Sequence, residues 1–379
     1  MTGLVRLAFA AFFFFYFTYI GLMSPYASLY FASLHYSAIE IAALMSMFQV
    51  TRILGPFAWG WLADIKRDRL GIIRITSLLA CFIFSAIFYI DSSWALLIWM
   101  LLFNTVISSL MPLGEAATIH ALYKDNTFDQ RYGRLRLWGS IGFIVMVMGA
   151  GAWFEVHGIQ SLPWFGMAAL VILAILARTL KEPPMEAVHH VTTSFWHVLN
   201  HHHVRWFLSA NFWMIFGHAA LYVFYSLYLD RLGYSKAEIG LFWMLGVLAE
   251  VVFFYFQNSF FKRFTAQHIL MASYLIMALR FVMIAYWPNT VVLIVAQIMH
   301  AATFGAHHSA SLKMLQTWFG GHLQARGQAL YTTVSYGIGG TVGGLVAGWV
   351  WEGLGPEHVF GLAALSGLLG YLCIRKVNA

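Results

Sequence analysis

Charged residues are scarce in this chain. Lys, Arg, Asp and Glu make up 10% of its 379 residues, whereas they account for about a quarter of an ordinary soluble domain. So few charges cannot cover a water-facing surface, which excludes a soluble globular protein. The apolar fraction is 61% and falls into long runs separated by short polar turns. The composition therefore predicts a membrane protein.

Other absences narrow the possible functions. The chain has two cysteines, Cys81 and Cys373, and both lie in apolar runs, which excludes a disulfide framework. It has no HExxH or CxxC spacing and no GxxxxGK[ST] loop, so we expect no metal site, no cofactor and no drive by ATP. The loops are too short for a catalytic domain. An enzyme is therefore not expected.

The apolar runs predict an all-α protein. About 20 residues span a hydrocarbon core, and a backbone in lipid must pair its polar groups within the segment. The period-2 alternation of a membrane β-barrel is absent. The sequence predicts twelve transmembrane helices, at 7–32, 37–64, 70–90, 94–122, 132–155, 161–180, 205–230, 236–262, 266–287, 289–314, 324–351 and 356–375.

Basic residues predict the orientation of these helices. Lys and Arg cluster after the even-numbered runs and at both termini, while the opposite side carries only Arg231 and Lys236. By the positive-inside rule the clustered side is cytoplasmic. We expect a multi-pass protein of the inner membrane, with both termini in the cytoplasm. The net charge of +7 then reflects topology and predicts no binding of nucleic acid.

The chain contains an internal repeat. Residues 28–42 (SLYFASLHYSAIEIA) and 226–240 (SLYLDRLGYSKAEIG) are identical at eight of fifteen positions. The same offset of 198 residues places Arg52 opposite Glu250. The longest polar stretch, 181–204, separates six predicted helices from six others. We therefore predict two pseudo-symmetric six-helix bundles, 1–180 and 205–379, joined by a cytoplasmic linker, which is the organisation of many secondary transporters.

Several ionisable residues fall inside the predicted helices. A charge at the bilayer centre costs roughly 2.5–3.5 kcal/mol on insertion scales, so such residues mark functional sites by default. One interpretation is a water-filled cavity that binds substrate and carries protons. The alternative is static ion pairs that hold helices together, or, for each histidine, a hydrogen-bonded core residue. The candidate residues are Arg52, Glu115, Arg136, His218, Glu250, Arg280 and His300.

Several motifs resemble those of the major facilitator superfamily. GWLAD at 60–64, followed by basic residues, resembles the superfamily's loop after the second helix. FFFFYF at 12–17, PLGEA at 112–116 and GRLRLWGSIG at 133–142 resemble the lactose-permease family of proton symporters. RLWGS at 136–140, GYSKAEIG at 233–240, AEVV at 249–252 and MHAATF at 299–304 resemble the phenylpropionate permease group.

The resemblance implies particular roles for the buried polar residues. Glu115 and Arg136 would face the substrate, and Glu250, Arg280 and His300 correspond to the proton-coupling set. Thr303 stands where lactose permeases have a carboxylate, and His218 stands near the position of another acidic residue. These departures put a sugar substrate and the identity of the proton carrier in question.

Charge counting favours an anionic substrate. Three buried arginines, Arg52, Arg136 and Arg280, face two buried carboxylates, Glu115 and Glu250. The surplus cation and the resemblance together predict a monomeric proton-coupled importer of an aromatic carboxylate such as phenylpropionate. A sugar or nucleoside symporter is the alternative. A drug/proton antiporter is less favoured, because residues 139–151 lack the proline of the antiporter motif.

Two further patterns concern helix ends and helix packing. Asp64, four residues after Gly60, is expected to act at a cytoplasmic gate, and the alternative is a solvated helix end. Gly340, Gly344 and Gly348 form a stripe of small residues at helical spacing. Such stripes let helices approach closely in membranes, so this one is predicted to pack against a neighbouring helix.

Overall fold

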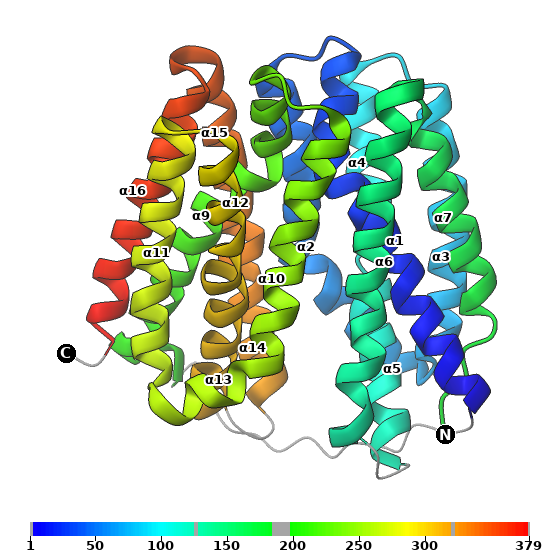
Figure 1. Cartoon of the computed structure of the whole chain (residues 1–379). Helices are drawn as coiled ribbons and strands as arrows, with labels where there is room; N and C mark the ends of the chain where they lie inside the picture. The colour runs from blue at the N-terminus through cyan, green and yellow to red at the C-terminus, as the bar shows by residue number, and fades with distance from the viewer. Residues whose placement is uncertain (1–2, 125–127, 184–197, 320–322, 378–379) are drawn as a thin grey trace. The chain divides into compact units, whose positions relative to one another are not determined.

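The computed structural model describes residues 3–124, 128–183, 198–319 and 323–377, and these residues form helices and no strand (Figure 1). The first part of the chain forms α1 (Gly3–Ser33), α2 (Ala38–Lys66), α3 (Arg69–Ser85), η1 (Ala86–Phe88), α4 (Ser93–Ile107), α5 (Leu110–Lys124), α6 (Phe128–His157), η2 (Ile159–Ser161) and α7 (Leu162–Ala177). The later part forms α9 (His202–Arg231), α10 (Lys236–Arg263), α11 (Ala266–Tyr286), α12 (Thr290–Ile298), η3 (Ala301–Ala306), α13 (His307–Trp318), α14 (Gln324–Thr332), η5 (Thr333–Gly339), α15 (Gly340–Leu354) and α16 (Pro356–Arg375).

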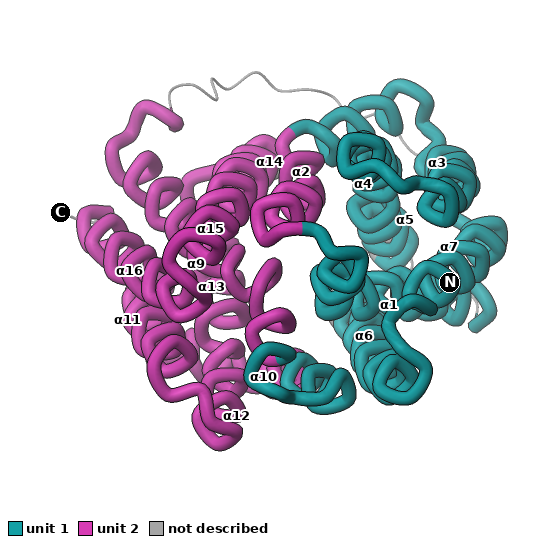
Figure 2. Tube along the Cα trace, turned by 90° about the horizontal axis from the view of Figure 1, so that it is seen from above, with its two compact units in different colours: residues 1–36, 54–187, 230–244 teal, residues 37–53, 188–229, 245–379 magenta. Residues whose placement is uncertain are grey.

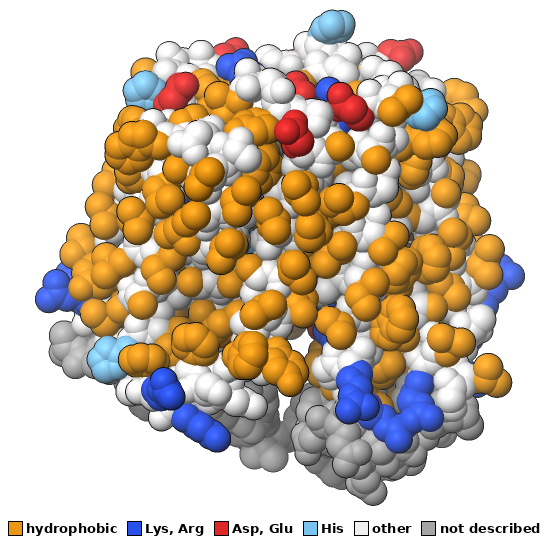
Figure 3. Space-filling view, viewed as in Figure 1, with side chains coloured by type: hydrophobic (Ala, Val, Ile, Leu, Met, Phe, Trp, Pro, Cys, Tyr) orange, Lys and Arg blue, Asp and Glu red, His pale blue; other side chains and the backbone are white. Residues whose placement is uncertain are grey.

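These helices confirm the predicted all-α membrane fold. Eleven helical stretches in the described residues are long and apolar enough to cross a membrane. The remaining predicted span, 324–351, is occupied by α14, η5 and α15, and η5 is a π-helix. Hydrophobic side chains cover the helix flanks in Figure 3, while the visible acidic side chains gather near one end of the helices and most basic ones near the other.

Three predicted spans are interrupted in the structure, and one of them is 324–351, which contains η5. The span 94–122 breaks between α4 and α5, at Ser108 and Ser109. The span 289–314 contains the π-helix η3 between α12 and α13. A π-helix adds a residue to a turn without changing the apolar character of the segment, so hydropathy alone did not predict it. Interruptions of this kind are frequent at functional sites.

The described helices belong to two units. Unit 1 comprises residues 1–36, 54–187 and 230–244, and unit 2 comprises 37–53, 188–229 and 245–379. Both α2 and α10 therefore change unit part-way along their length (Figure 2). Each unit contains the beginning of one helix from the other sequence repeat. Most of the predicted linker, residues 184–197, lies outside the described residues, and the division into bundles at 181–204 stays a prediction.

The repeated sequence forms the same local structure twice. At the start of α2, the Ser37 hydroxyl accepts from the amide of Glu40, and the Glu40 carboxylate accepts from the amide of Ser37. Ser235 and Glu238 make the same two bonds at the start of α10. This reciprocal capping box satisfies amides that lack a partner within the helix. The repeat therefore begins both helices in the same way.

The small-residue stripe packs as predicted. A Cβ atom added at Gly340, Gly344 or Gly348 of α15 would meet the side chain of Gln49, Ser46 or Ala42, respectively. All of these residues belong to unit 2. Glycine is required here because the two helices approach too closely for a larger residue.

Candidate functional site

Glu250 and His300 form a hydrogen-bonded pair inside unit 2. Glu250 lies in α10, and His300 lies between α12 and the π-helix η3. The His300 Nε2 atom is 3.0 Å from the Glu250 Oε1 atom, and the two side chains are 8% and 15% exposed, respectively. A carboxyl group in such surroundings gains or loses a proton with a direct effect on its neighbours, because little water screens the change.

Arg280 determines which nitrogen of His300 carries the proton. The Arg280 Nη1 atom, on α11, lies 2.9 Å from the His300 Nδ1 atom. A guanidinium has donors only, so the His300 Nδ1 atom must accept. The proton of the neutral imidazole is then on Nε2, where it is donated to Glu250. The three side chains therefore form one directed chain, from Arg280 through His300 to Glu250.

Arg280 is fully buried, and one of its donors is unpaired. Its Nη1 atom also donates to the Thr303 hydroxyl at 3.1 Å, and its Nη2 atom donates to the Gln297 Oε1 atom at 3.4 Å. The Nε atom has no hydrogen-bond partner among the described residues. An unpaired buried donor is costly, so this atom is a natural point of attachment for an acceptor group.

His218 joins the same network through Thr303. The His218 Nδ1 atom lies 2.9 Å from the backbone carbonyl of Met214, which can only accept, so Nδ1 carries a proton. Its Nε2 atom lies 3.3 Å from the Thr303 hydroxyl. The Thr303 hydroxyl accepts from Arg280, and its single proton lies within reach of both the His218 Nε2 atom and the His300 carbonyl oxygen, which is 3.4 Å away. The sequence predicts His218 as a site residue and singles out Thr303 only as a departure from the lactose-permease pattern, and it does not predict Gln297.

The spacing of the missed residues contains a signal. Gln297, His300 and Thr303 follow one another at intervals of three and lie on one helix face. Tyr222 of α9 was also missed. It lies close enough to Arg52, Glu250 and Arg280 for their charges to act on its hydroxyl group. A search for polar residues spaced three apart around a histidine in an apolar run would have identified Gln297 and Thr303 beside His300. No such pattern marks Tyr222.

Arg52 lies at the same depth in its helix as Glu250. Each stands fourteen residues after the first residue of its helix, α2 or α10. The Arg52 side chain is exposed, and its guanidinium carbon lies 5.3 Å from the centre of the Tyr336 ring, which belongs to the π-helix η5. Arg52, Tyr336 and Glu250 all belong to unit 2. The repeat thus brings both of its charged positions into one unit.

Glu115 and Arg136 form a separate pair in unit 1. The Arg136 Nε atom is 3.2 Å from the Glu115 Oε1 atom, and each side chain is about one third exposed, at 34% and 33%. The Tyr132 hydroxyl donates to the same carboxylate oxygen at 3.4 Å, and the Arg136 guanidinium lies 4.2 Å from the centre of the Phe17 ring. The pair is partly exposed, so it is available to a polar ligand as well as to a structural role.

The predicted gate residues Gly60 and Asp64 lie near the end of α2. Asp64 is exposed, and a Cβ atom at Gly60 would meet no atom within 4 Å.

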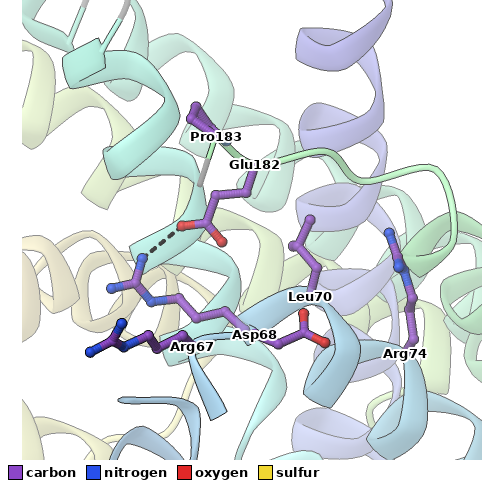
Figure 4. A pocket seen from close by; sticks show the side chains of 7 residues that line it. Arg67, Asp68, Leu70, Arg74, Glu182 and Pro183 are labelled. Atoms are coloured by element: carbon purple, nitrogen blue, oxygen red, sulfur yellow. Dashed lines mark hydrogen bonds and ion pairs between the residues drawn. The ribbon is translucent and has the colours of Figure 1, made fainter. Parts of the chain in front are cut away.

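Glu182 contacts two basic side chains near the start of α3 and in α5. Its Oε1 atom lies 2.7 Å from the Arg69 Nη1 atom and 2.9 Å from the His120 Nδ1 atom. Glu182 and Arg69 line a pocket of about 190 Å³ with Arg67, Asp68, Leu70, Arg74 and Pro183 (Figure 4). A role of Asp64 in gating stays a prediction.

Among the described residues, no three His, Cys, Asp or Glu side chains come together to hold a metal ion.

The chain is similar to known transporters over nearly its full length. The chain is 29% identical over 372 residues to the probable 3-phenylpropionic acid transporter of Escherichia coli (strain K12), with 96% of each chain covered. It is 24% identical over 379 residues to maltose permease of Geobacillus stearothermophilus, covering 98% of this chain and 95% of the permease.

Solved structures share the fold. The nucleoside transporter NupG superposes with a TM-score of 0.84 at 16% identity, covering 100% of this chain and 99% of NupG. The POT family transporter PepTSo superposes with a TM-score of 0.78 at 10% identity, covering 100% and 99% of the two chains. The family model named MFS_1 like matches residues 6–362, so this multi-pass membrane protein belongs to the MFS_1-like family of major facilitator transporters.

Proposed function

We propose that this transporter imports a small organic anion together with a proton, and that the anion is an aromatic carboxylate such as 3-phenylpropionate. The directed chain from Arg280 through His300 to Glu250 is the observation that carries the proposal. It couples one buried cation to one carboxyl group that can hold a proton.

The charges of the chain explain how the two solutes would be coupled. Ionised Glu250 is the nearest carboxylate to the Arg280 network. Protonation of Glu250 removes that negative charge and leaves the Arg280 cation uncompensated in a buried place, which is unfavourable. A substrate carboxylate would then replace the lost charge. Proton and anion therefore favour each other's binding, which is the requirement for symport.

Arginine suits a carboxylate for geometric reasons. Its planar guanidinium offers two parallel donors that match the two oxygens of the acid. The unpaired Nε atom of Arg280 provides one such donor. The ion pair of Arg136 with Glu115 removes one arginine and one carboxylate from the charge count. Of the remaining arginines, Arg52 is exposed and Arg280 is fully buried, so Arg280 is the buried cation that lacks a counter-charge once Glu250 is protonated, which favours an anionic solute.

The relatives support this choice of substrate class. The probable 3-phenylpropionic acid transporter matches nearly the full chain. Tyr222 and Tyr336 lie near the charged residues and offer aromatic rings to an aromatic solute.

A proton-coupled symporter of a sugar or nucleoside is the second candidate. The partly exposed Glu115–Arg136 pair beside the Phe17 ring carries this alternative. A carboxylate and a guanidinium bind hydroxyl groups, and an aromatic ring packs on a sugar or base. Maltose permease and the nucleoside transporter NupG are among the similar proteins.

A transport assay separates the two candidates. Purified protein in liposomes with an inward proton gradient should accumulate 3-phenylpropionate and acidify the lumen. The neutral amide of the acid, maltose and a nucleoside serve as matched comparisons. Accumulation of maltose or a nucleoside, with no uptake of the acid, would replace the carboxylate proposal with the second candidate.

We also propose a cytoplasmic-membrane location with both termini in the cytoplasm and a six-plus-six division at 181–204. The basic clusters after alternate helices support the orientation. A reporter enzyme that is active only in the cytoplasm, fused after residue 379, should be active. Inactivity of that fusion would contradict the proposed topology.

A further inference from the structure

The first turns of α2 and α10 each receive a carboxylate from a different helix. In unit 1, the backbone amide of Lys236 at the start of α10 donates to the Glu155 Oε2 atom of α6 at 2.7 Å. In unit 2, the backbone amide of Ile39 at the start of α2 donates to the Glu352 Oε2 atom of α15 at 3.2 Å. The same type of contact therefore occurs once in each unit.

The two contacts are closely related within the repeat, since Glu352 follows Glu155 by 197 residues, one fewer than the offset of 198 between Ser37 and Ser235. Glu155 and Glu352 both stand four residues after a glycine, in the sequences GAWFE (151–155) and GWVWE (348–352). A Cβ atom added at Gly151 would lie 2.7 Å from the Lys236 carbonyl oxygen, and one added at Gly348 would lie 3.3 Å from the Ala38 carbonyl oxygen. Each glutamate is thus held over the first turn of its partner helix by a close glycine contact.

Each contact joins one sequence repeat to the other. The α2 segment 37–53 comes from the first repeat but belongs to unit 2, and the α10 segment 230–244 comes from the second repeat but belongs to unit 1. The capping boxes already satisfy the third amide of each helix, through Ser37 and Ser235. The additional glutamate satisfies a further amide and places negative charge at the positive end of the helix dipole.

We propose that Glu155 and Glu352 are paired latches, which hold the two sequence repeats together at the ends of the helices opposite the basic loops. Both carboxylates must leave their amides before the repeats separate at this end. The latches therefore set how often the transporter opens there, whatever the substrate. Both glutamates are exposed, so replacing them weakens the latches without leaving a cavity in the core.

Thiol labelling beneath one latch tests the proposal. Ser46 is buried against Gly344, below the Glu352 contact. A reporter is made by Ser46→Cys in a background with Cys81→Ser and Cys373→Ser. The rate of labelling by a membrane-impermeant maleimide is measured on the full chain in nanodiscs without substrate. Failure of the substrate proposal would therefore not affect the result.

Removal of the charge should speed labelling. Glu352→Gln is expected to raise the rate about two- to fivefold, because loss of a charge at a helix N-terminus has that effect on an equilibrium. Glu155→Gln should raise the rate at the same reporter, although it lies in the other unit. The double variant should show about the product of the two factors. Glu→Ala at either position, which also removes the acceptor oxygen, should act more strongly.

Glu357→Gln is the matched control. Glu357 is another exposed carboxylate, in the first turn of its own helix α16, so its neutralisation should leave the labelling rate unchanged. An unchanged rate in the double Gln and double Ala variants would overturn the latch proposal. An effect of Glu352 without any effect of Glu155 would overturn the requirement that both release together.

Discussion

At the scale of single residues, the orientation of His300 is the central fact. Arg280 donates to one imidazole nitrogen, so the other must present its hydrogen to Glu250. In the proposed mechanism, Glu250 is the member of this chain that takes up and releases the proton, while Arg280 stays charged and the His300 imidazole stays neutral. This assignment makes separate predictions for Glu250 and for Arg280.

Glu250→Gln is expected to abolish proton-driven accumulation while it preserves exchange of substrate across the membrane. Glutamine mimics the protonated acid, so it can support the substrate-bound form but cannot release a proton. The measurement compares gradient-driven uptake with counterflow of radiolabelled 3-phenylpropionate in liposomes. Glu115→Gln is the control and should keep coupling. Accumulation by Glu250→Gln at the native level would assign the proton to another group.

Arg280→Lys is expected to weaken binding of the aromatic acid by about 10- to 100-fold, in line with the roughly 1.5–3 kcal/mol of a hydrogen bond to a charged group. Lysine keeps the charge but loses the planar fork that matches a carboxylate. Binding of the acid and of its neutral amide is measured by calorimetry.

The amide and a second variant supply the controls for Arg280. Affinity for the amide should change much less than affinity for the acid, and Arg136→Lys should affect the acid little. Equal losses for acid and amide in Arg280→Lys would mean that the residue serves structure or proton coupling.

Part of this site could be predicted from single residues. Glu250, Arg280 and His300 stand out because a charged or titratable group is rare in an apolar run. Thr303 and Gln297 do not stand out, because a hydroxyl or an amide is common in membrane helices. Their hydrogen bonds depend on the side-chain conformation of Arg280. The residues next to Arg280 in the sequence do not predict that conformation.

At the scale of helices, the repeat was the strongest predictor. Equivalent residues 198 positions apart form equivalent capping boxes at the starts of α2 and α10. The interruptions were not predictable, because apolar content is continuous through them. The interruption by η5 has no counterpart in α6, the fifth run of the first half. The other two occur in corresponding runs, the fourth of each half: one at Ser108 and Ser109, the other at residues 301–306. The second one carries Thr303 into contact with Arg280 and His218.

The capping boxes make a prediction about stability. Ser37→Ala and Ser235→Ala should each lower the free energy of unfolding by about 0.5–2 kcal/mol, the usual cost of losing an N-cap side chain. Thermal unfolding in detergent measures the effect. Ser92→Ala is the matched control, because Ser92 precedes α4 without a side-chain capping bond. Equal destabilisation by all three substitutions would contradict a specific capping role.

At the scale of the whole chain, the division into units differs from the order of the sequence. The hydrophobic runs predict six helices on each side of the polar stretch, and most of that stretch lies outside the described residues. The exchange of 37–53 and 230–244 between units depends on pairs of distant segments that fit each other, such as Gly348 of α15 against the first turn of α2. The sequence of either segment, taken alone, does not indicate which distant segment it packs against. Because the two repeats are alike, the sequence could have suggested that an exchange of a helix segment in one repeat would also occur in the other.

The last prediction tests whether the two charged positions of the repeat face water. Arg52→Cys and Glu250→Cys, each in a background with Cys81→Ser and Cys373→Ser, should react with small water-soluble thiol reagents, because Arg52 and Glu250 carry ionisable groups that need hydration within the membrane. Substrate should slow both reactions several-fold. Leu54→Cys and Tyr255→Cys are the controls, since both native side chains are apolar and exposed along the helix flanks, at 69% and 82%. These cysteines should stay unreactive because lipid excludes the reagents. If cysteines at positions 52 and 250 react no faster than the controls, the ionisable residues face lipid or a closed interior, and the site in unit 2 is a structural ion-pair network instead of a transport pathway.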